Sequence, residues 1–416
     1  MNSNTNIKQG YKQTSLGILP QEWEVVRFND IFIRIPSKKY QIKTKEYQSN
    51  GKYPVIDQGQ TAVISYSNND NKVFKNSSVI VFGDHTRELK FVDFDFVVGA
   101  DGVQLLKTKE NFDNRFFYYQ LKTKKIPNTG YNRHFKFLLD MSFVCPTLAE
   151  QEKIAQILGV WDKGISVLKS LIEAKTKRKK ALMQRLLTPP CESPTPSLRA
   201  SETSAAIYKK SVDCHDLTAS NLAMTEKNSK AKQSLRFAEF TDKWQEMRLG
   251  DICEIYQPQT IPQSDFTKEG YNVYGANGII GKYHSYNHEK EQIAIACRGN
   301  SCGAVNFTNP KSWITGNAMV INLDNSKNAD KIFVYYVLLN SNLNYLVTGS
   351  GQPQITSNIK KHSIKLPTLA EQKKIAQVLS ACDKEIELLK SKFQCLKTQK
   401  RGLMQRLLNG EVRVKC

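Results

Sequence analysis

The chain has 416 residues and carries 60 lysines and arginines against 39 aspartates and glutamates, a formal net charge of +21. This length allows about two to four domains, and this charge favours a polyanionic partner, which among soluble proteins is most often nucleic acid. The first residues lack the apolar core of a signal peptide and no stretch approaches about 18 apolar residues, so we expect a cytoplasmic protein without membrane contact.

The first globular segment begins with a motif that returns later in the chain. Residues 21–32 read QEWEVVRFNDIF, and a second version, DKWQEMRLGDIC, occupies residues 242–253 at an offset of 221. The matched pairs are Trp23 with Trp244, Arg27 with Arg248, Asp30 with Asp251, and Ile31 with Ile252. Such self-similarity predicts that one structural unit is used twice.

Short apolar runs between Gly, Asn and Asp turns predict strands in both globular segments. These runs cover residues 77–83, 94–100, 291–297 and 318–323. The aromatic stretches RFFYYQL at Arg115 and IFVYYVL at Ile332 predict one buried helix in each segment. We therefore expect a mixed α/β fold, or mostly β globules, whose strand order the sequence does not give.

A long helix is predicted after each globular segment. Residues 146–187 begin with PTLAEQ and end with LMQRLL, and residues 367–408 match them without a gap, with 24 of 42 positions identical. Prolines follow the first copy and Asn409-Gly410 follows the second, and both are helix-stopping signals. The two copies therefore predict two equivalent helices.

The helix starts carry an N-capping pattern. Thr147 and Thr368 stand at the N-cap positions, and Glu150 and Glu371 follow three residues later. This spacing predicts capping boxes, in which the hydroxyl and the carboxylate each accept a hydrogen bond from a free backbone N–H group of the first turn.

Apolar residues in both helices alternate spacings of four and three, which is the seam of a coiled coil. The positions that define this predicted pairing surface, which we also expect to support subunit docking, are Leu158, Ile165, Leu168, Ile172, Leu379, Ile386, Leu389 and Phe393. Lysines interrupt the seam at Lys175 and Lys179 in the first copy and at Lys400 in the second. A helix packed only on its own domain is the alternative, but a helix of about 60 Å extends beyond a domain of this size. We therefore expect the two helices to pair with each other.

Between the two halves the composition becomes rich in proline, serine and threonine, and no apolar period is visible. Such a segment cannot bury enough apolar surface to offset its chain entropy, so we expect a flexible linker. The predicted organisation is a first globular domain at 1–145, a helix at 146–188, the linker at 189–234, a second globular domain at 235–366 and a second helix at 367–416.

Polar loops occur at corresponding places in the two globular segments. Asn, Gln and Arg side chains can make paired hydrogen bonds to base edges in the major groove, and glycine lets a backbone approach a ligand closely. The candidate DNA-binding residues are Gln58, Gln60, His85, Arg87, Tyr131, Asn132, Arg133, Asn277, Arg298, Asn300, Gln352 and Gln354. Plain surface turns, which also favour Gly and Asn, are the alternative.

We find no catalytic or metal-binding motif. The sequence has no GxxxxGK[ST] phosphate loop, no HExxH, no GxSxG and no Asp/Asn-Pro-Pro-aromatic stretch, and its nine cysteines form no CxxC pair. His85 beside Asp84 and Arg87 suggests an acid/base group, but one histidine on a turn is more often a polar contact. We expect no catalytic residue, no metal site and no cofactor in this chain.

The order of globular segment, PTLAEQ…LMQRLL helix, globular segment and second PTLAEQ…LMQRLL helix resembles the specificity subunit of type I restriction-modification systems. The opening of each helix, the QRLL close and the W-x-x-x-R start of each globular segment carry this resemblance, which covers nearly the whole chain. The linker after Thr188 departs from the family pattern, because it is longer than the short turn expected there.

The resemblance implies two target-recognition domains joined by two long antiparallel coiled-coil helices with a pseudo-twofold repeat. Each domain would read one half of a bipartite, asymmetric target in double-stranded DNA. Modification (methylase) subunits would dock on the helices and carry the S-adenosylmethionine, while restriction subunits would carry the ATP- and Mg-dependent translocation and cleavage.

Two other functions are compatible with the same sequence features. One is a DNA-recognition protein that works without methylase partners. The other is an architectural coiled-coil tether with two protein-binding heads, which predicts no salt-dependent affinity for DNA, whereas phosphate recognition predicts a steep salt dependence.

Overall fold

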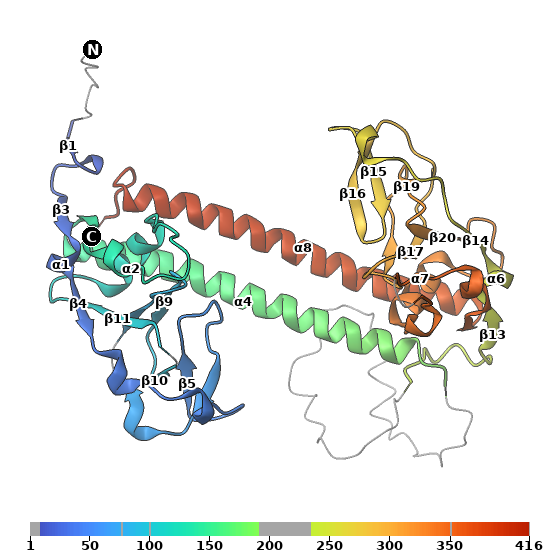
Figure 1. Cartoon of the computed structure of the whole chain (residues 1–416), viewed down its shortest axis with the longest axis horizontal. Coiled ribbons are helices and arrows are strands. Elements are labelled where there is room, and N and C mark those ends of the chain that lie inside the picture. Colours follow the sequence, from blue (N-terminus) through green and yellow to red (C-terminus); the bar gives the residue numbers. More distant parts are fainter. Residues whose placement is uncertain (1–8, 76–77, 100, 191–233, 350–351, 416) are drawn as a thin grey trace. The chain divides into compact units, whose positions relative to one another are not determined.

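A computed structural model describes residues 9–75, 78–99, 101–190, 234–349 and 352–415. The chain divides into two compact units (Figure 1). Unit 1 consists of Met1–Leu171 and Leu389–Cys416, and unit 2 of Ile172–Leu388. The predicted linker at 189–234 lies outside the described residues except for its ends, and the predicted domain boundaries stay predictions.

Unit 1 contains two four-stranded sheets. The first is antiparallel, in the order β4-β11-β8-β9, and the second has the order β6-β5-β10-β7, with β5 and β10 parallel. Their strands are β4 (Phe32–Ile35), β5 (Tyr53–Ile56), β6 (Ser65–Ser67), β7 (Val73–Phe74), β8 (Val79–Gly83), β9 (Leu89–Val92), β10 (Phe96–Val98) and β11 (Val103–Thr108). A hairpin of β1 (Tyr11–Thr14) and β2 (Gly17–Pro20), a pair of β3 (Glu24–Arg27) and β12 (Ser142–Cys145), and the short helices α1 (Phe28–Ile31) and α3 (Lys136–Leu139) complete the segment.

Unit 2 repeats most of this topology, with three strands instead of four in its second sheet. Its antiparallel sheet has the order β14-β20-β17-β18 and its second sheet the order β16-β15-β19, with β15 and β19 parallel. The strands are β14 (Glu254–Tyr256), β15 (Tyr271–Gly275), β16 (Gly278–Tyr283), β17 (Ile293–Ala296), β18 (Val305–Phe307), β19 (Trp313–Ile314) and β20 (Ala318–Asn322), and β13 (Gln245–Arg248) pairs with β21 (Ser363–Leu366) beside α6 (Leu249–Ile252). The four predicted strands fall on β8, β10, β17 and β20, so these predictions and the mixed α/β class are confirmed.

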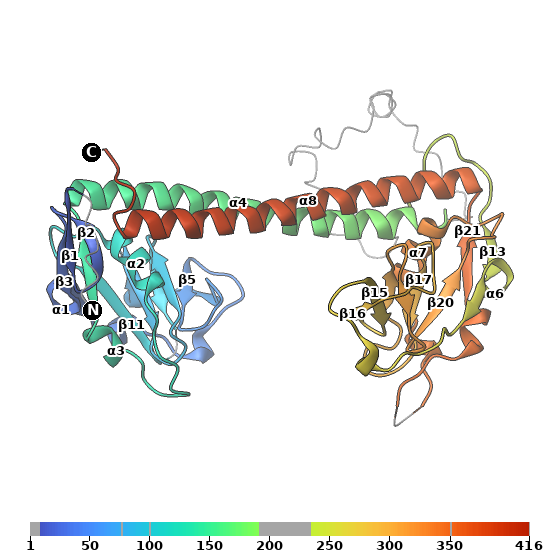
Figure 2. The same cartoon turned by 90° about the horizontal axis from the view of Figure 1, so that it is seen from above.

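One buried helix in each unit lies against the long helices (Figure 2): α2 (Asn114–Thr123) in unit 1 and α7 (Lys331–Asn340) in unit 2. An aspartate caps each of them, because Asp113 accepts from the N–H of Phe116 at 2.6 Å and Asp330 from the N–H of Phe333 at 2.9 Å. Both predicted aromatic helices are therefore confirmed, and their burial explains their apolar composition.

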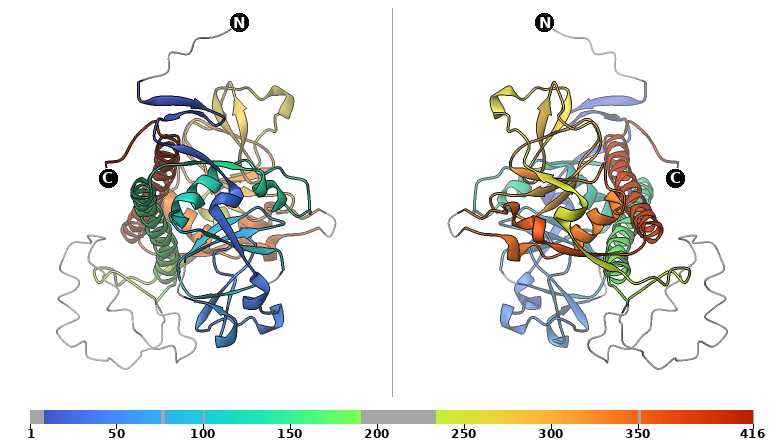
Figure 3. Two further views of the ribbon diagram at one scale, coloured as in Figure 1. Left: turned by 90° about the vertical axis from the view of Figure 1, so that its left-hand side faces the viewer. Right: turned by 90° about the vertical axis from the view of Figure 1, so that its right-hand side faces the viewer.

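The two long helices are α4 (Leu148–Leu186) and α8 (Leu369–Leu408), and Figure 3 shows them side by side. Both unit boundaries fall inside these helices. Within each unit the helices run antiparallel, since the start of one meets the end of the other. The predicted seam is oriented inward: Leu158, Leu168, Leu379 and Ile386 are buried, and Ile165, Ile172, Leu389 and Phe393 are half-buried.

Each globular segment packs on both helices of its unit. In unit 1, Ile154 and Leu158 of α4 and Leu407 and Leu408 of α8 share one core with Trp23. In unit 2, Ile375 and Leu379 of α8 and Met183 and Leu186 of α4 share one core with Phe333. A segment is therefore completed by its own helix start and by the end of the helix from the other half of the sequence.

The predicted capping boxes are wrong in their carboxylate half. Glu150 does not turn back to its own N-cap, because its carboxylate accepts from Arg413 at 2.7 Å and from the indole N–H of Trp23 at 3.0 Å. Glu371 likewise binds Arg236, with Nε–Oε1 and Nη2–Oε2 distances of 3.0 and 2.8 Å. In both cases one guanidinium donates two hydrogen bonds to the buried carboxylate, which satisfies it better than a single backbone donor could.

The arginines that bind these carboxylates occupy equivalent places after the helices. The N–H of Leu235 donates to the carbonyl of Arg185 at 3.0 Å, and the N–H of Val412 donates to the carbonyl of Arg406 at 3.2 Å. Arg236 and Arg413 directly follow these residues. The backbone at Leu235 therefore binds the end of α4 at the same helix position at which the backbone at Val412 binds the end of α8. This correspondence holds although the sequence between Pro190 and Ser234 has no counterpart after α8.

The lysines that interrupt the seam form ion pairs. In unit 1, Nζ of Lys400 lies 2.5 Å from Oδ1 of Asp162 on α4, and the hydroxyl of Tyr119 on α2 donates to Oδ2 of the same carboxylate at 2.6 Å. The Lys400 ammonium also lies 4.9 Å from the centre of the Tyr119 ring. Burial lowers the pKa of Lys400 while its bond to Asp162 opposes that shift, and burial raises the pKa of the Tyr119 hydroxyl.

Unit 2 has the same arrangement. Lys179 binds Asp383 at 2.5 Å, Tyr336 of α7 donates to that carboxylate at 2.7 Å, and Lys175 pairs with Glu385 at 2.6 Å. In both units one carboxylate therefore joins the two long helices and the buried aromatic helix of the globular segment.

Replacing Asp162 by alanine should lower the free energy of unfolding by about 1–2 kcal/mol, because Lys400 and Tyr119 both lose their acceptor while the site stays partly solvated. The measurement is urea unfolding followed by circular dichroism. Glu387→Ala, at an exposed acid on α8, is the matched control and should change the stability by less than about 0.5 kcal/mol. Equal losses in both variants would contradict the assigned role of Asp162.

Candidate nucleic-acid interface

The three predicted polar loops of unit 1 lie together. They follow β5 (residues 57–60), β8 (residues 83–87) and α2 (residues 129–134). The N–H of His85 donates to Oε1 of Gln58 at 3.2 Å, which joins the first two loops. The rings of His85 and Tyr131 stack at 4.6 Å with an interplanar angle of 10°, which joins the second and third.

Asp84 is the buried residue that connects these loops by hydrogen bonds. It is 3% exposed, and its carboxylate accepts from the N–H of Phe135 at 2.8 Å and from Nε2 of Gln104 at 3.1 Å. Its carbonyl accepts from the N–H of His134 at 2.8 Å. A buried carboxylate with several donors is a stable hydrogen-bond acceptor, so Asp84 positions the loop around it.

Gln58 braces the same cluster through both ends of its amide. Oε1 accepts from His85, and Nε2 donates to the carbonyl of Asp101 at 3.0 Å. Gly102 has a φ of +87°, and a Cβ added there would lie 2.7 Å from Oε1 of Gln58, so the turn requires glycine. The structure thus places Gln58 among loop-supporting contacts, whereas Gln60 is exposed at the tip of its loop.

Strain and unpaired polar atoms gather in the loop after β8. Arg87 adopts a φ of +64°, which is uncommon for a residue with a side chain. Its Nε and the Nδ1 of His85 are buried and have no hydrogen-bond partner. Both features are typical of functional sites, where the surroundings hold a conformation that isolated residues disfavour.

An open cavity of about 690 Å³ adjoins this cluster. His85, Tyr131 and Arg133 line it together with Arg34 and Lys38. Asn132 and Arg133 are exposed, and the guanidinium of Arg34 lies 5.2 Å from the centre of the Phe135 ring. Cations beside aromatic and amide groups form a surface that suits nucleic acid.

Sequence reasoning missed six polar residues of this cavity: Arg34, Ser37, Lys38, Gln41, Asp101 and Gln104. Arg34 and Lys38 belong to a short basic run, RIPSKK, which was the available signal. Gln104 is a single polar residue inside the apolar strand β11, and a buried amide in such a strand needs a partner.

In unit 2 the structure brings together two of the three predicted loops. Arg298 and Gln354 form an antiparallel backbone bridge, and the N–H of Gly299 donates to the carbonyl of Pro353 at 3.1 Å. The four candidate side chains on these loops are exposed: Arg298, Asn300, Gln352 and Gln354. Asn277 is exposed in the turn between β15 and β16. These loops follow strands that correspond to those of unit 1, but their side chains differ.

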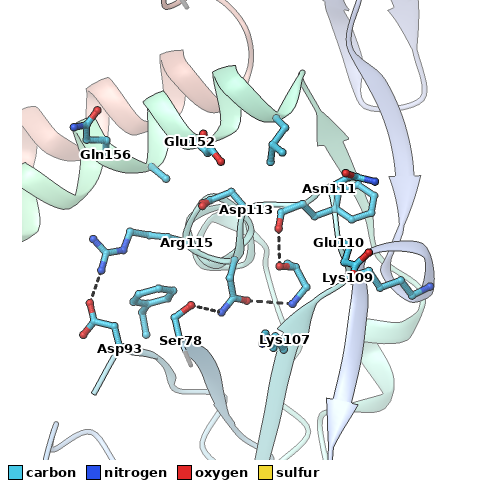
Figure 4. Close-up of a pocket in the computed structure, with 16 residues that line it drawn as sticks. Ser78, Asp93, Lys107, Lys109, Glu110, Asn111, Asp113, Arg115, Glu152 and Gln156 are labelled. Carbon is cyan, nitrogen blue, oxygen red and sulfur yellow. Dashed lines mark hydrogen bonds and ion pairs between the residues drawn. The ribbon is translucent and has the colours of Figure 1, made fainter. Parts of the chain in front are cut away.

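A second cavity of unit 1, about 680 Å³, lies where α2 begins beside α4 (Figure 4). Arg115 binds Asp93 there at 2.6 Å, and Glu110, Asp113 and Glu152 also line the cavity. Burial raises the pKa of Asp113. Because its four acids outnumber its three cations, this cavity suits a polyanion less well than the one beside Tyr131.

The described part of the chain offers no group of three or more His, Cys, Asp or Glu side chains placed to hold a metal ion. Among the same residues no helix is long and apolar enough to cross a membrane.

The family model described as "Type I restriction modification DNA specificity domain" matches the chain twice, at residues 20–175 and 241–398. The chain is similar to the type I restriction enzyme MjaVIII specificity subunit of Methanocaldococcus jannaschii, with 23% identity over 95% of this chain and 94% of that protein. It is equally similar, at 23% identity over 98% of both chains, to the putative type I restriction enzyme MjaX specificity subunit of the same organism. Its fold is similar to the crystal structure of the S subunit of a type I restriction-modification system from M. genitalium, with a TM-score of 0.64, 17% identity and 98% of each chain covered.

Replacing Gln58 by alanine should loosen the loop cluster, because His85 and the turn at Asp101 lose their shared partner. We expect faster amide hydrogen exchange in residues 84–87 and 131–134, measured by mass spectrometry. Gln60→Ala, in the same loop, is the matched control and should leave the exchange of these residues unchanged. Unchanged exchange in the Gln58 variant would show that the amide does not brace the cluster.

Proposed function

The chain belongs to the family of type I restriction-modification DNA specificity proteins, and we propose that each of its two units reads one half of a bipartite, asymmetric target in double-stranded DNA. The observation that carries this proposal is the loop cluster of unit 1, where predicted DNA-binding residues meet beside a cation-lined cavity. The equivalent loops of unit 2 present Arg298, Asn300 and Gln354 to solvent. One topology with two sets of side chains suits two different half-sites.

The proposed role is recognition without catalysis in this chain. The buried carboxylate of the cluster, Asp84, accepts hydrogen bonds from a backbone N–H and from a side-chain amide. These bonds support a structural role for Asp84. Adenine methylation with S-adenosylmethionine and ATP- and Mg-dependent cleavage are assigned to partner methylase and restriction subunits.

The long helices are proposed to set the distance between the half-sites and to dock the methylase subunits. Exposed apolar residues on α4 support docking, because Val160, Val167 and Leu171 lie on one helix face outside the seam. The alternative of a tether with two protein-binding heads has no comparable support, since the loop clusters carry cations and amides where protein-binding surfaces favour apolar anchors.

Coexpression of the chain with a methylase encoded beside it should produce methylation at one bipartite, asymmetric motif. The reason is that the loops around Gln58 and Asn277 differ in nearly every side chain. The measurement is methylome sequencing, and a strain that lacks this chain is the control. A palindromic motif would contradict two different half-sites.

Arg298→Ala should weaken DNA binding by about 1–3 kcal/mol and relax the preference at one position if the guanidinium reads a base. If it holds a phosphate, the loss should be uniform across sequences and the salt dependence shallower. The measurement is binding to target and scrambled duplexes at two salt concentrations. Lys373→Ala, at an exposed cation on α8, is the control. Unchanged affinity at both salt concentrations would remove Arg298 from the interface.

Adding one heptad to each long helix, after Leu168 and after Leu389, should move the half-sites apart while their sequences stay the same. Seven residues keep the seam in phase and lengthen a helix by about 10.5 Å, which is about three base pairs. Both insertions fall between the ion pairs of the two units in sequence and so preserve them. Methylation at the original spacing would show that these helices do not set the distance.

The insertion also rotates one half-site by about 100°, since B-DNA turns once in about 10.5 base pairs. A second variant with three heptads per helix adds about 31.5 Å, or about nine base pairs. Nine base pairs rotate the half-site by about 310°, which brings it back to within about 50° of its original orientation. It distinguishes a rotational failure from a wrong assignment of the spacer.

A further inference from the structure

We propose that Tyr131 and His85 form a stacking platform for one base that leaves the DNA duplex in the half-site read by unit 1. This inference rests on the proposed DNA recognition and adds a specific nucleobase site to it. The juxtaposition behind it is an exposed aromatic ring, stacked on the imidazole of His85, in the lining of a cavity that also contains Arg34, Lys38 and Arg133.

The exposure of Tyr131 is the first argument. Its side chain is 85% exposed, the highest value among the large hydrophobic residues of the described chain. One ring face covers His85 at 4.6 Å in a near-parallel arrangement, which leaves the other face open. An aromatic ring that is stacked on one face and open on the other can bind a planar base on its open face. Every base has a π-face, so this stacking needs no particular sequence.

The platform is held in place before any ligand arrives. The N–H of His85 is bound by Gln58, and the N–H of Thr129 donates to Nε2 of the buried His134 at 3.3 Å. The loop then turns at Gly130, which has a φ of +78°. These contacts hold the backbone on both sides of the stack, which reduces the conformational entropy that is lost when a base binds.

The cavity supplies the second half of a nucleotide site. Arg34, Lys38 and Arg133 line it beside the platform, and they outnumber its two acids, Asp84 and Asp101, whose carboxylates accept hydrogen bonds from the protein. Its volume of about 690 Å³ is large enough for a base and its sugar-phosphate. Cations can hold the flanking phosphates while the base stacks on Tyr131. The unpartnered Nδ1 of His85 is a further polar group at this place.

Unit 2 lacks this arrangement in its corresponding loops. Residues 297–303 and 348–356 contain no aromatic side chain. Tyr345, which is also exposed, instead directs its hydroxyl to Nδ1 of His362 at 2.5 Å, and the two rings are tilted by 41°. The proposed base site therefore belongs to the loop cluster of unit 1 and has no counterpart in these loops of unit 2.

The test is a thermodynamic cycle between the side chain and the base, using the full-length chain and duplexes that carry its target. Each position of the half-site is made abasic in turn, and affinities are measured for the wild type and for Tyr131→Ala, Tyr131→Phe and Tyr131→Leu. Tyr345→Ala is the matched control in unit 2. Because Tyr131 is exposed, these variants keep the buried core intact, and circular dichroism checks this.

At one position of the unit 1 half-site, base removal should weaken binding to the wild type and to Tyr131→Phe by about 5- to 150-fold, the effect of losing one stacked base. Tyr131→Ala and Tyr131→Leu should lose a similar factor and no longer distinguish the abasic duplex. A mismatch at that position should strengthen wild-type binding, because an unpaired base costs less to displace.

Independent, multiplicative losses from Tyr131→Ala and base removal would overturn the stacking site. Wild-type affinity of Tyr131→Leu would also overturn it, and would identify Tyr131 as an apolar wedge between base pairs. These failures leave sequence-specific binding intact, whereas a failure of the proposed function appears as the absence of salt-dependent binding to any target duplex.

Discussion

The exchange of helix ends between the two halves of the sequence is the constraint on which the structure depends. Glu150 and Glu371 are buried carboxylates at the starts of the long helices, and each is neutralised by an arginine that follows the other helix. A buried charge without a partner is costly, so neither globular segment can be completed by its own half alone. The repeat in the sequence therefore produces two units that share the same two helices.

The lysine interruptions of the seam belong to the same constraint. A seam that was apolar throughout would pair the two helices but would form no polar contact with the globular segments. Asp162 and Asp383 each join a lysine of the facing helix to a tyrosine of α2 or α7. The globular segment is thereby fixed to both helices at a defined rotation, and this orients the loops that follow β5 and β8 in unit 1.

The repeat, the four strands, both buried aromatic helices and the inward seam could be predicted because they depend on local periodicity. The carboxylate half of the capping boxes was wrong because Arg413 lies more than 260 residues from Glu150 in the sequence and only the fold brings them together. For the same reason the sequence could list Gln58, His85 and Tyr131 as candidates without showing that they meet. The scaffold role of Gln58 depends on the backbone of Asp101, and the cavity contribution of Gln104 depends on Asp84 across a sheet, so neither has a local signal.

We propose above all that each globular segment binds its own half-site and that the long helices set the distance between the two half-sites. The most direct measurement replaces residues 241–366 by the corresponding segment of another family member and determines the methylated motif of the chimera with the same methylase. The account predicts that one half of the motif changes while the other half and the spacing between them are preserved. A change in both halves, or in neither, would contradict it.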